Sequence, residues 1–350
     1  MTIARREIID DSCSGVYHCV SRCARRAWLC GFDAVTGRDY SHRRDWLENR
    51  LKDLSEAFCV DVLGYAIMSN HMHLVLQNRP ELVEALSDHE VAECWLRIYS
   101  GKYICDGADP DESKIECLCS DSGRIELLRC RLSDIGWFMK SLKEPLSRLA
   151  NEEDDCKGTF WEGRYKCTRL VDESALLAAL SYVDLNPVRG FMAVSPEKSD
   201  YTSVKCRCDA RNAKQVLAQK KVSSRLYGVT ENVACSDHWL SPVFEAPCGP
   251  PGSSLLPITF DQYLQLLDWT GRKIRGDKSG AIPSGLRPVL QRLDIEIDNW
   301  HRTVNTFGSR FCRIAGKVDS MKEAAVRAGL QFFRGFEAAR QAFVTRAAVT

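Results

Sequence analysis

The order of polar and apolar residues around His71 predicts a β-strand. Met72, Leu74 and Leu76 are apolar and alternate with His71 and His73. Successive side chains of a strand point to opposite faces, so the three apolar residues share a face that can pack on a core. The two histidines then lie side by side on the other face. Two adjacent imidazoles are a natural pair of metal ligands, although a lone His-x-His triplet is common in proteins that bind no metal.

The same periodicities predict the other elements of the first 200 residues. Period-two runs predict strands at 16–22, 59–68, 71–77 and 160–170, with a tight turn at Ser69-Asn70 between the middle two. Apolar residues at helical spacing predict helices at 43–57, 81–99, 132–150 and 173–185, the last stopped by Asn186-Pro187. Residues 101–123 are rich in Gly, Asp and Cys and predict a loop insertion at about 100–125.

The character of the chain changes after residue 200. The segment 201–255 contains a stretch rich in Pro, Gly and Ser, which is typical of a linker. Helical spacing then recurs at 260–269, 286–293, 300–315 and 320–345. We therefore expect an α+β domain at 1–200, a linker at 201–255 and a mostly α-helical C-terminal domain at 256–350. We also expect this last domain to serve target binding or assembly and not the chemical step.

Composition narrows the classes of protein to consider. The net charge of +1 gives no general attraction to nucleic acid or membrane, but residues 157–169 carry four Lys or Arg residues against Glu162 alone. The 17 cysteines form no C-x-x-C pair, which argues against a zinc ribbon or finger. The chain shows no secretory signal and no apolar run of transmembrane length, so we expect a cytoplasmic protein without a membrane partner.

A second group of candidate residues lies at the end of the predicted helix 173–185. Tyr182 and Asn186 are four residues apart, which places them on one helix face, one turn from each other. Taken alone, Tyr182 is an aromatic residue at the edge of a core, and Asn186 caps a helix before proline. Their order after His71 and His73 changes that interpretation.

Five segments in this order resemble the REP-associated tyrosine transposases, a family of HUH single-tyrosine transposases. They are YHCVSR (17–22), the histidine strand, WFMKSLK (137–143), GTFWEGRYK (158–166) and SYVDLNPVRG (181–190), and together they cover roughly residues 10–195. The resemblance implies a ferredoxin-like antiparallel sheet with helices on one face. It also implies a divalent metal, Mg²⁺ or Mn²⁺, bound by His71 and His73, with Asn186 as the third ligand. Tyr182 is then the nucleophile that attacks single-stranded or hairpin DNA.

The expected chemistry is the cutting and rejoining of DNA without ATP. A divalent ion polarises the scissile phosphate and orients it toward the nucleophile. The tyrosine ester stores the energy of the broken bond, so a free 3′-hydroxyl can reverse the step with another DNA end. The sequence contains no Gly-rich phosphate loop of the Walker type, which agrees with such a mechanism.

Basic and aromatic residues near the predicted strands are candidate DNA contacts. Phosphate contacts are expected from Arg22, Arg25, Arg26 and Lys166. Two interpretations remain for the aromatic residues Trp28, Phe160 and Trp161. They either stack on unpaired bases or pack in the core. In the C-terminal helices, Arg272, Lys273, Arg275 and Lys278 form a basic strip.

Two other functions remain open from the sequence. One is a catalytically idle binder of DNA or RNA hairpins that derives from a transposase. The other is a zinc hydrolase or structural metal protein, which needs a third strong ligand that no H-E-x-x-H motif or cysteine cluster supplies. The DNA target and the oligomeric state, a homodimer included, also stay open.

Overall fold

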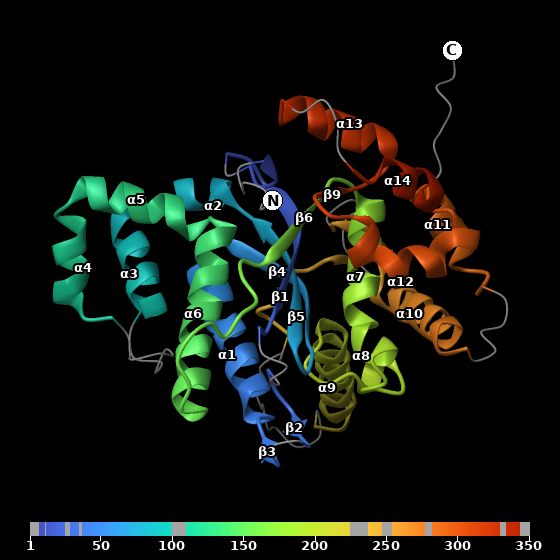
Figure 1. The fold of residues 1–350 in the computed structure, drawn as a ribbon, viewed down its shortest axis with the longest axis horizontal. Coiled ribbons are helices and arrows are strands. Elements are labelled where there is room, and N and C mark those ends of the chain that lie inside the picture. The colour runs from blue at the N-terminus through green and yellow to red at the C-terminus, as the bar shows by residue number, and fades with distance from the viewer. Residues whose placement is uncertain are drawn as a thin grey trace.

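A five-stranded sheet forms the centre of the protein (Figure 1). Its strands, in spatial order, are β4 (Val60–Ile67), β5 (His71–Asn78), β1 (Gly15–Arg22), β6 (Lys166–Leu170) and β9 (Ile314–Ala315). The first four pair antiparallel, and β9 joins the edge in parallel. The computed structural model describes residues 7–10, 12–24, 29–34, 37–99, 110–224, 237–246, 254–276, 282–329 and 334–343, with only the backbone at 217–224.

The first half of the chain has the ferredoxin-like connection that the resemblance implies. It runs β1, α1 (His42–Ala57), β4, β5, α6 (Ile135–Glu153) and β6, so each helix crosses between strands. The predicted turn at Ser69-Asn70 is confirmed, because the Met68 N–H donates to the His71 carbonyl across the hairpin at 2.8 Å. The predicted strand 160–170 is shorter than expected, since regular pairing begins at Lys166.

One face of the sheet packs on α1 and α6. Met72, Leu74 and Leu76 of β5 are fully buried there, as the alternation predicts. The face that carries His71 and His73 is covered as well, by α7 (Glu173–Asp184). This helix is apolar nearly all round because it lies between the sheet and the C-terminal helices, as Figure 1 shows. The sheet therefore has helices on both faces.

The C-terminal part is mostly helical, as expected. Its helices are α10 (Phe260–Arg275), α11 (Arg287–Arg292), α12 (Trp300–Arg310), α13 (Val318–Arg327) and α14 (Phe336–Ala342), with the 3₁₀ turn η3 (Ile297–Asn299). It shares one core with α7 and supplies β9 to the sheet, where the Arg169 N–H donates to the Arg313 carbonyl at 2.8 Å. Residues 256–350 thus complete the fold around α7 instead of forming a core of their own.

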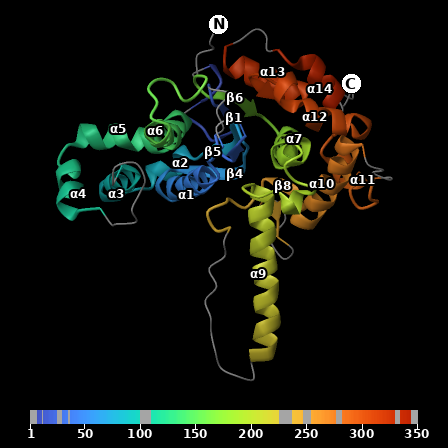
Figure 2. The same cartoon turned by 60° about the horizontal axis from the view of Figure 1, so that its bottom comes forward.

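The segment expected to be a linker contains regular structure. It holds the helix α9 (Ser203–Ser224), which projects away from the sheet in Figure 2, and the short strand β7 (Phe244–Glu245), which pairs with β8 (Leu256–Thr259). Residues 225–236 and 247–253 lie outside the described part of the chain. Remaining short elements are β2 (Phe32–Asp33), β3 (Arg38–Asp39), α8 (Asn186–Arg189) and η2 (Pro196–Lys198).

The prediction of a loop insertion at about 100–125 is wrong for its second half, from residue 112 onward. Residues 100–109 lie outside the described residues, but the chain then forms α4 (Glu112–Cys119) and α5 (Ser122–Leu132). Asp111 and Asp121, which suggested a loop by composition, are the N-caps of these helices. The predicted helix 81–99 is divided into α2 (Pro80–Glu84) and α3 (Asp88–Tyr99).

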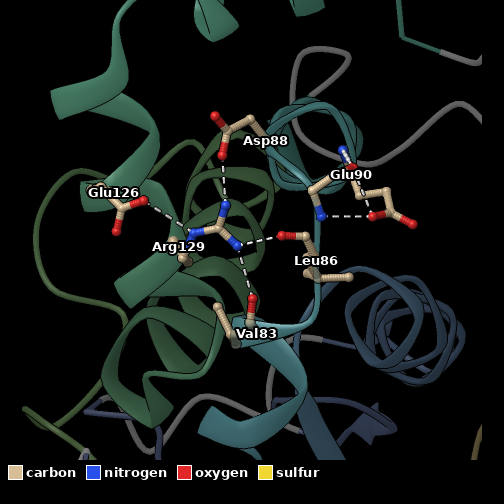
Figure 3. A network of polar contacts seen from close by, with 7 residues as sticks. Val83, Leu86, Asp88, Glu90, Glu126 and Arg129 are labelled. Atoms are coloured by element: carbon tan, nitrogen blue, oxygen red, sulfur yellow. Dashed lines mark hydrogen bonds and ion pairs between the residues drawn. The ribbon is translucent and has the colours of Figure 1, made fainter.

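Arg129 on α5 fixes these helices to one another (Figure 3). Its guanidinium donates to the carbonyls of Val83 and Leu86, at 2.9 and 2.6 Å, and pairs with Asp88 at 2.6 Å. Satisfying two carbonyls between α2 and α3 makes the break in the predicted helix a fixed corner. The insertion is therefore a packed helical unit beside α1 and α6. Among the described residues, no helix has both the length and the apolar character required to cross a membrane.

Candidate functional site

Three histidines meet on the sheet face beneath α7. His71 and His73 come from β5, and His18 comes from the neighbouring β1. His18 Nε2 lies 3.0 Å from His73 Nδ1, and the two rings stack nearly parallel at 5.2 Å between centroids. His18 is a residue of this cluster that no sequence pattern had indicated. The alternation along the strand places His18 on the same face as Val16 and Val20. Only the pairing of β1 with β5 brings it beside His73.

Hydrogen bonds orient both histidines that were predicted as metal ligands. His71 Nδ1 lies 2.6 Å from the amide oxygen of Asn70, and because that oxygen accepts, the ring proton sits on Nδ1. His71 Nε2 then carries the lone pair. His73 Nδ1 is engaged by His18, while His73 Nε2 is buried without a partner among the described residues. An oriented imidazole with one unpartnered nitrogen is what a metal-ligating histidine requires.

The three imidazoles are held neutral by their surroundings. Burial lowers the pKa of His18 to about 4 and that of His71 to about 4, and it places the pKa of His73 well below the ordinary value. Arg189 lowers the pKa of all three further by charge repulsion. Neutral imidazole is the form that binds a metal. Within the described residues, no group of three or more His, Cys, Asp or Glu side chains has the arrangement of a metal site.

Tyr182 lies directly against this cluster. Its ring meets His73 edge-on, with centroids 5.3 Å apart, and His18 at 5.7 Å. Phe307 of α12 packs on it at 5.9 Å, and its hydroxyl lies beside the backbone of Gly308, where a Cβ atom would stand 2.7 Å from the oxygen. The C-terminal part of the chain therefore forms one wall around the predicted nucleophile, while its expected role in target binding or assembly stays a prediction.

Arg189 connects Tyr182 with Asn186. Its guanidinium lies over the Tyr182 ring at 4.1 Å and donates to Asn186 Oδ1 and to the Asn305 carbonyl, each at 2.9 Å. Asn186 is buried, with 6% of its surface exposed, and its Nδ2 has no partner among the described residues. Arg189 was not predicted as a site residue. Its position, one helical turn after Asn186, is the sequence signal that indicates it.

The end of α7 is held in place by Asp184. This fully buried carboxylate accepts hydrogen bonds from the hydroxyls of Tyr263 and Ser203, at 2.7 Å each, and from the Val204 N–H at 3.1 Å. Burial raises the pKa of Asp184, and the hydrogen bonds oppose the shift. Because its partners come from α9 and α10, Asp184 ties the Tyr182 helix to later parts of the chain.

The candidate DNA contacts have different outcomes. Arg22 is paired opposite His71, and Lys166 is paired with Val20, so both lie on the sheet face that carries the histidines. Arg22 also approaches Glu162 at 3.8 Å. Arg25, Arg26, Trp28 and Lys278 lie outside the described residues.

Burial decides the interpretation of two aromatic residues. Phe160 and Trp161 are 2% and 7% exposed and belong to the core on the α6 side, so the core-packing interpretation holds for both. The Trp161 indole N–H donates to the Lys143 carbonyl at 3.1 Å. Of the C-terminal basic strip, Arg272 pairs with Asp268, and Arg275 donates to the Val194 carbonyl.

An open pocket of about 610 Å³ lies beside His71. It is lined by Gly31, Phe32, Arg44, Met68, Ser69, Asn70, His71, Asn186, Arg189, Gly190, Met192 and Asn305. Its walls therefore come from β2, α1, the β4–β5 turn, α8 and α12. This volume is within the range of small-ligand sites in proteins.

Comparison with known proteins adds one match of low similarity. Neither a family model nor a curated protein matches this chain. A solved structure described as "Structure of the REP associates tyrosine transposase bound to a REP hairpin" aligns with 58% of this chain and 82% of its own, at 9% identity and a TM-score of 0.34. At this identity and TM-score, the similarity assigns neither a family nor an activity.

Proposed function

We propose that this protein is a metal-dependent tyrosine transposase that cuts and rejoins single-stranded DNA through a phosphotyrosine intermediate. The observation that carries the proposal is the contact of Tyr182 with His73. In this contact a hydroxyl-bearing ring, from a helix, lies against an imidazole whose Nε2 is buried without a partner among the described residues. A metal-ligating histidine leaves one ring nitrogen free of protein partners, as His73 Nε2 is among the described residues.

His71 and His73 would hold the metal through their Nε2 atoms. Bound there, a Mg²⁺ or Mn²⁺ ion would polarise a phosphodiester and favour the in-line geometry for attack. His18 holds the His73 ring by its hydrogen bond, and Asn70 holds His71 in the same way. Both rings are thus fixed before a ligand arrives, so little orientation entropy is lost on binding.

Tyr182 would supply the nucleophile. Its hydroxyl oxygen forms a bond to phosphorus and loses its proton, while the bond from phosphorus to the 3′-oxygen breaks and leaves a free 3′-hydroxyl. The products are a 5′-phosphotyrosine ester and that hydroxyl, which attacks the ester to rejoin strands. Arg189, over the Tyr182 ring, holds the ring in position and brings positive charge to the site. Arg22 and Lys166 would bind neighbouring phosphates from the same sheet face.

The test is covalent trapping on DNA. The protein is incubated with Mn²⁺ and single-stranded DNA that flanks its own gene, and adducts are resolved on denaturing gels. We expect an adduct with the natural protein and none with Tyr182→Phe, which removes only the oxygen. Tyr99→Phe is the matched control, because Tyr99 is 45% exposed on α3 and its hydroxyl contacts Ser141 away from the site.

The outcomes separate the competing functions. An adduct that persists in Tyr182→Phe rejects Tyr182 as the nucleophile. DNA binding without any adduct favours the idle hairpin binder. Unchanged cleavage with a chelator removes the metal from the mechanism, and recovery with Zn²⁺ alone favours a zinc hydrolase.

A further inference from the structure

The pocket beside His71 has charged residues of one sign. Arg44 and Arg189 line it, and no Asp or Glu is among the described residues that line it. Arg44 donates to the Cys30 sulfur at 3.2 Å, and Arg189 donates to amide oxygens. Neither guanidinium forms an ion pair with a described carboxylate, although the charge of Arg44 helps to lower the pKa of Asp39. The neighbouring Arg43 is different, because it pairs with Glu153 and Asp154 in the core. Two guanidiniums in one pocket, neither of them in an ion pair with a described carboxylate, favour an anion.

The same pocket offers an exposed aromatic ring. Phe32 lines it from β2 and is 59% exposed. Phe191 follows the lining residue Gly190, is 87% exposed and has a φ of +53°, in the left-handed region. Exposing a phenyl ring on strained backbone costs free energy, and such strain is concentrated at functional sites. A flat ring beside two cations suits a ligand that has both a phosphate and a planar base.

The polarity of Asn186 can be assigned from its neighbour. A guanidinium has only donors, so the Asn186 atom that faces Arg189 at 2.9 Å must be the oxygen. The other atom, Nδ2, is a buried donor without a partner among the described residues. A metal would need the oxygen, which already accepts from a cation, and a second positive charge there would be repelled. The Oδ1 atom of Asn186, which a metal would need, is therefore already engaged by Arg189. Its Nδ2 atom is left to donate to an acceptor on a substrate.

We propose that this pocket binds one unpaired nucleotide of the DNA substrate, with its phosphate on Arg44 and Arg189, its base against Phe32, and Asn186 as a donor to it instead of a metal ligand. The inference rests on the proposed function, because the pocket adjoins His71 and a nucleotide there would lead the strand toward Tyr182. The amides of Asn70 and Asn305 also line the pocket and can contact base edges.

Abasic scanning tests the base contact. Full-length Tyr182→Phe protein is titrated with the flanking single-stranded DNA, followed by fluorescence anisotropy, while the base at each position in turn is replaced by an abasic site. We expect one position where the loss of the base weakens binding about 5- to 150-fold, the effect of a lost stacking contact. In Phe32→Ala, an abasic site at that position should hardly weaken binding further, while abasic sites at other positions should weaken it as before. If no position couples to Phe32, the pocket does not hold a base.

Salt dependence and metal affinity test the other contacts. Arg44→Gln should lower the slope of log affinity against log salt by about 0.7, the value for one phosphate contact on a single strand, and the exposed control Arg148→Gln should not. Asn186→Ala should weaken DNA binding and leave Mn²⁺ affinity, measured by electron paramagnetic resonance, unchanged. A loss of Mn²⁺ affinity with unchanged DNA affinity would restore Asn186 as a ligand and overturn the proposal.

Two further outcomes have defined meanings. A free deoxynucleotide that binds with the same Phe32 and Arg44 dependence, while DNA binding ignores both residues, replaces the strand as the ligand and overturns the proposal. Adduct formation without any coupling to the pocket overturns this inference alone and leaves the proposed function standing. A protein that neither binds nor cuts single-stranded DNA rejects both.

Discussion

The contact between Tyr182 and Gly308 predicts that one methyl group in the C-terminal part will slow the chemistry. A Cβ atom at Gly308 would stand 2.7 Å from the Tyr182 hydroxyl oxygen and 3.1 Å from Cζ, against about 3.4 Å for ordinary contacts. Gly308→Ala must therefore displace the ring by roughly 0.7 Å, since ordinary heavy-atom contacts do not become shorter. Displacements near 1 Å cost up to about a hundredfold in rate, so we expect adduct formation to slow about ten- to a hundredfold.

Stability should change much less than the rate. Overpacking costs about 1–3 kcal/mol, but replacing glycine by alanine inside a helix returns about 1 kcal/mol. The net destabilisation is then roughly 0–2 kcal/mol, which chemical denaturation can measure. Mn²⁺ affinity should be unchanged, because Tyr182 is not a proposed ligand.

The assay is single-turnover adduct formation at saturating DNA. Gly123→Ala on α5 is the matched control, because its Cβ would meet nothing closer than 3.6 Å and the helix lies in the insertion. The control should cut at the natural rate. An unaltered adduct rate in folded Gly308→Ala would refute the idea that α12 positions the nucleophile.

Three other predictions follow from the same geometry. In the presence of a chelator, the free energy of unfolding should fall as the pH drops from about 6.5 to 4, by roughly 3 kcal/mol from His18 alone. The reason is that the pKa of His18 is about 4 in the folded protein, so the unfolded chain binds the proton first. Denaturation midpoints that stay constant over that range in the natural protein, or that fall equally in His18→Gln, would contradict this. His18→Ala should weaken Mn²⁺ binding about 10- to 100-fold by releasing the His73 ring, and His18→Gln should recover part of the lost affinity. Equal Mn²⁺ affinity in the natural protein and both variants would remove His18 from the site. A chain that ends near residue 240 should fail to fold around α7, because it loses the fully buried Trp300 and Phe307. A cooperative, native-like thermal unfolding transition of that fragment would instead support a C-terminal domain that folds separately.

Local pattern was enough to predict the elements that position the proposed ligands. The alternation at Met72, Leu74 and Leu76 assigned the histidines to the opposite face, and the turn at Ser69-Asn70 followed from residues that tolerate turn geometry. Such features depend only on neighbours along the chain, so periodicity reveals them. Composition was a poorer guide at 110–125, because Asp and Gly serve helix caps as well as loops.

The sequence by itself determined the strands β1, β4 and β5, the face of β5 that carries His71 and His73, and the helix that presents Tyr182, whereas the ferredoxin-like arrangement was implied by a resemblance. Only the tertiary structure decided what surrounds these residues. The partners that complete the site come from 55 residues away in the case of His18 and from the C-terminal helix α12 in the case of Phe307 and Gly308. The apolar surface of α7 demanded a cover on both sides, but no local pattern specifies which distant segment supplies it, because packing depends on shape and burial in three dimensions.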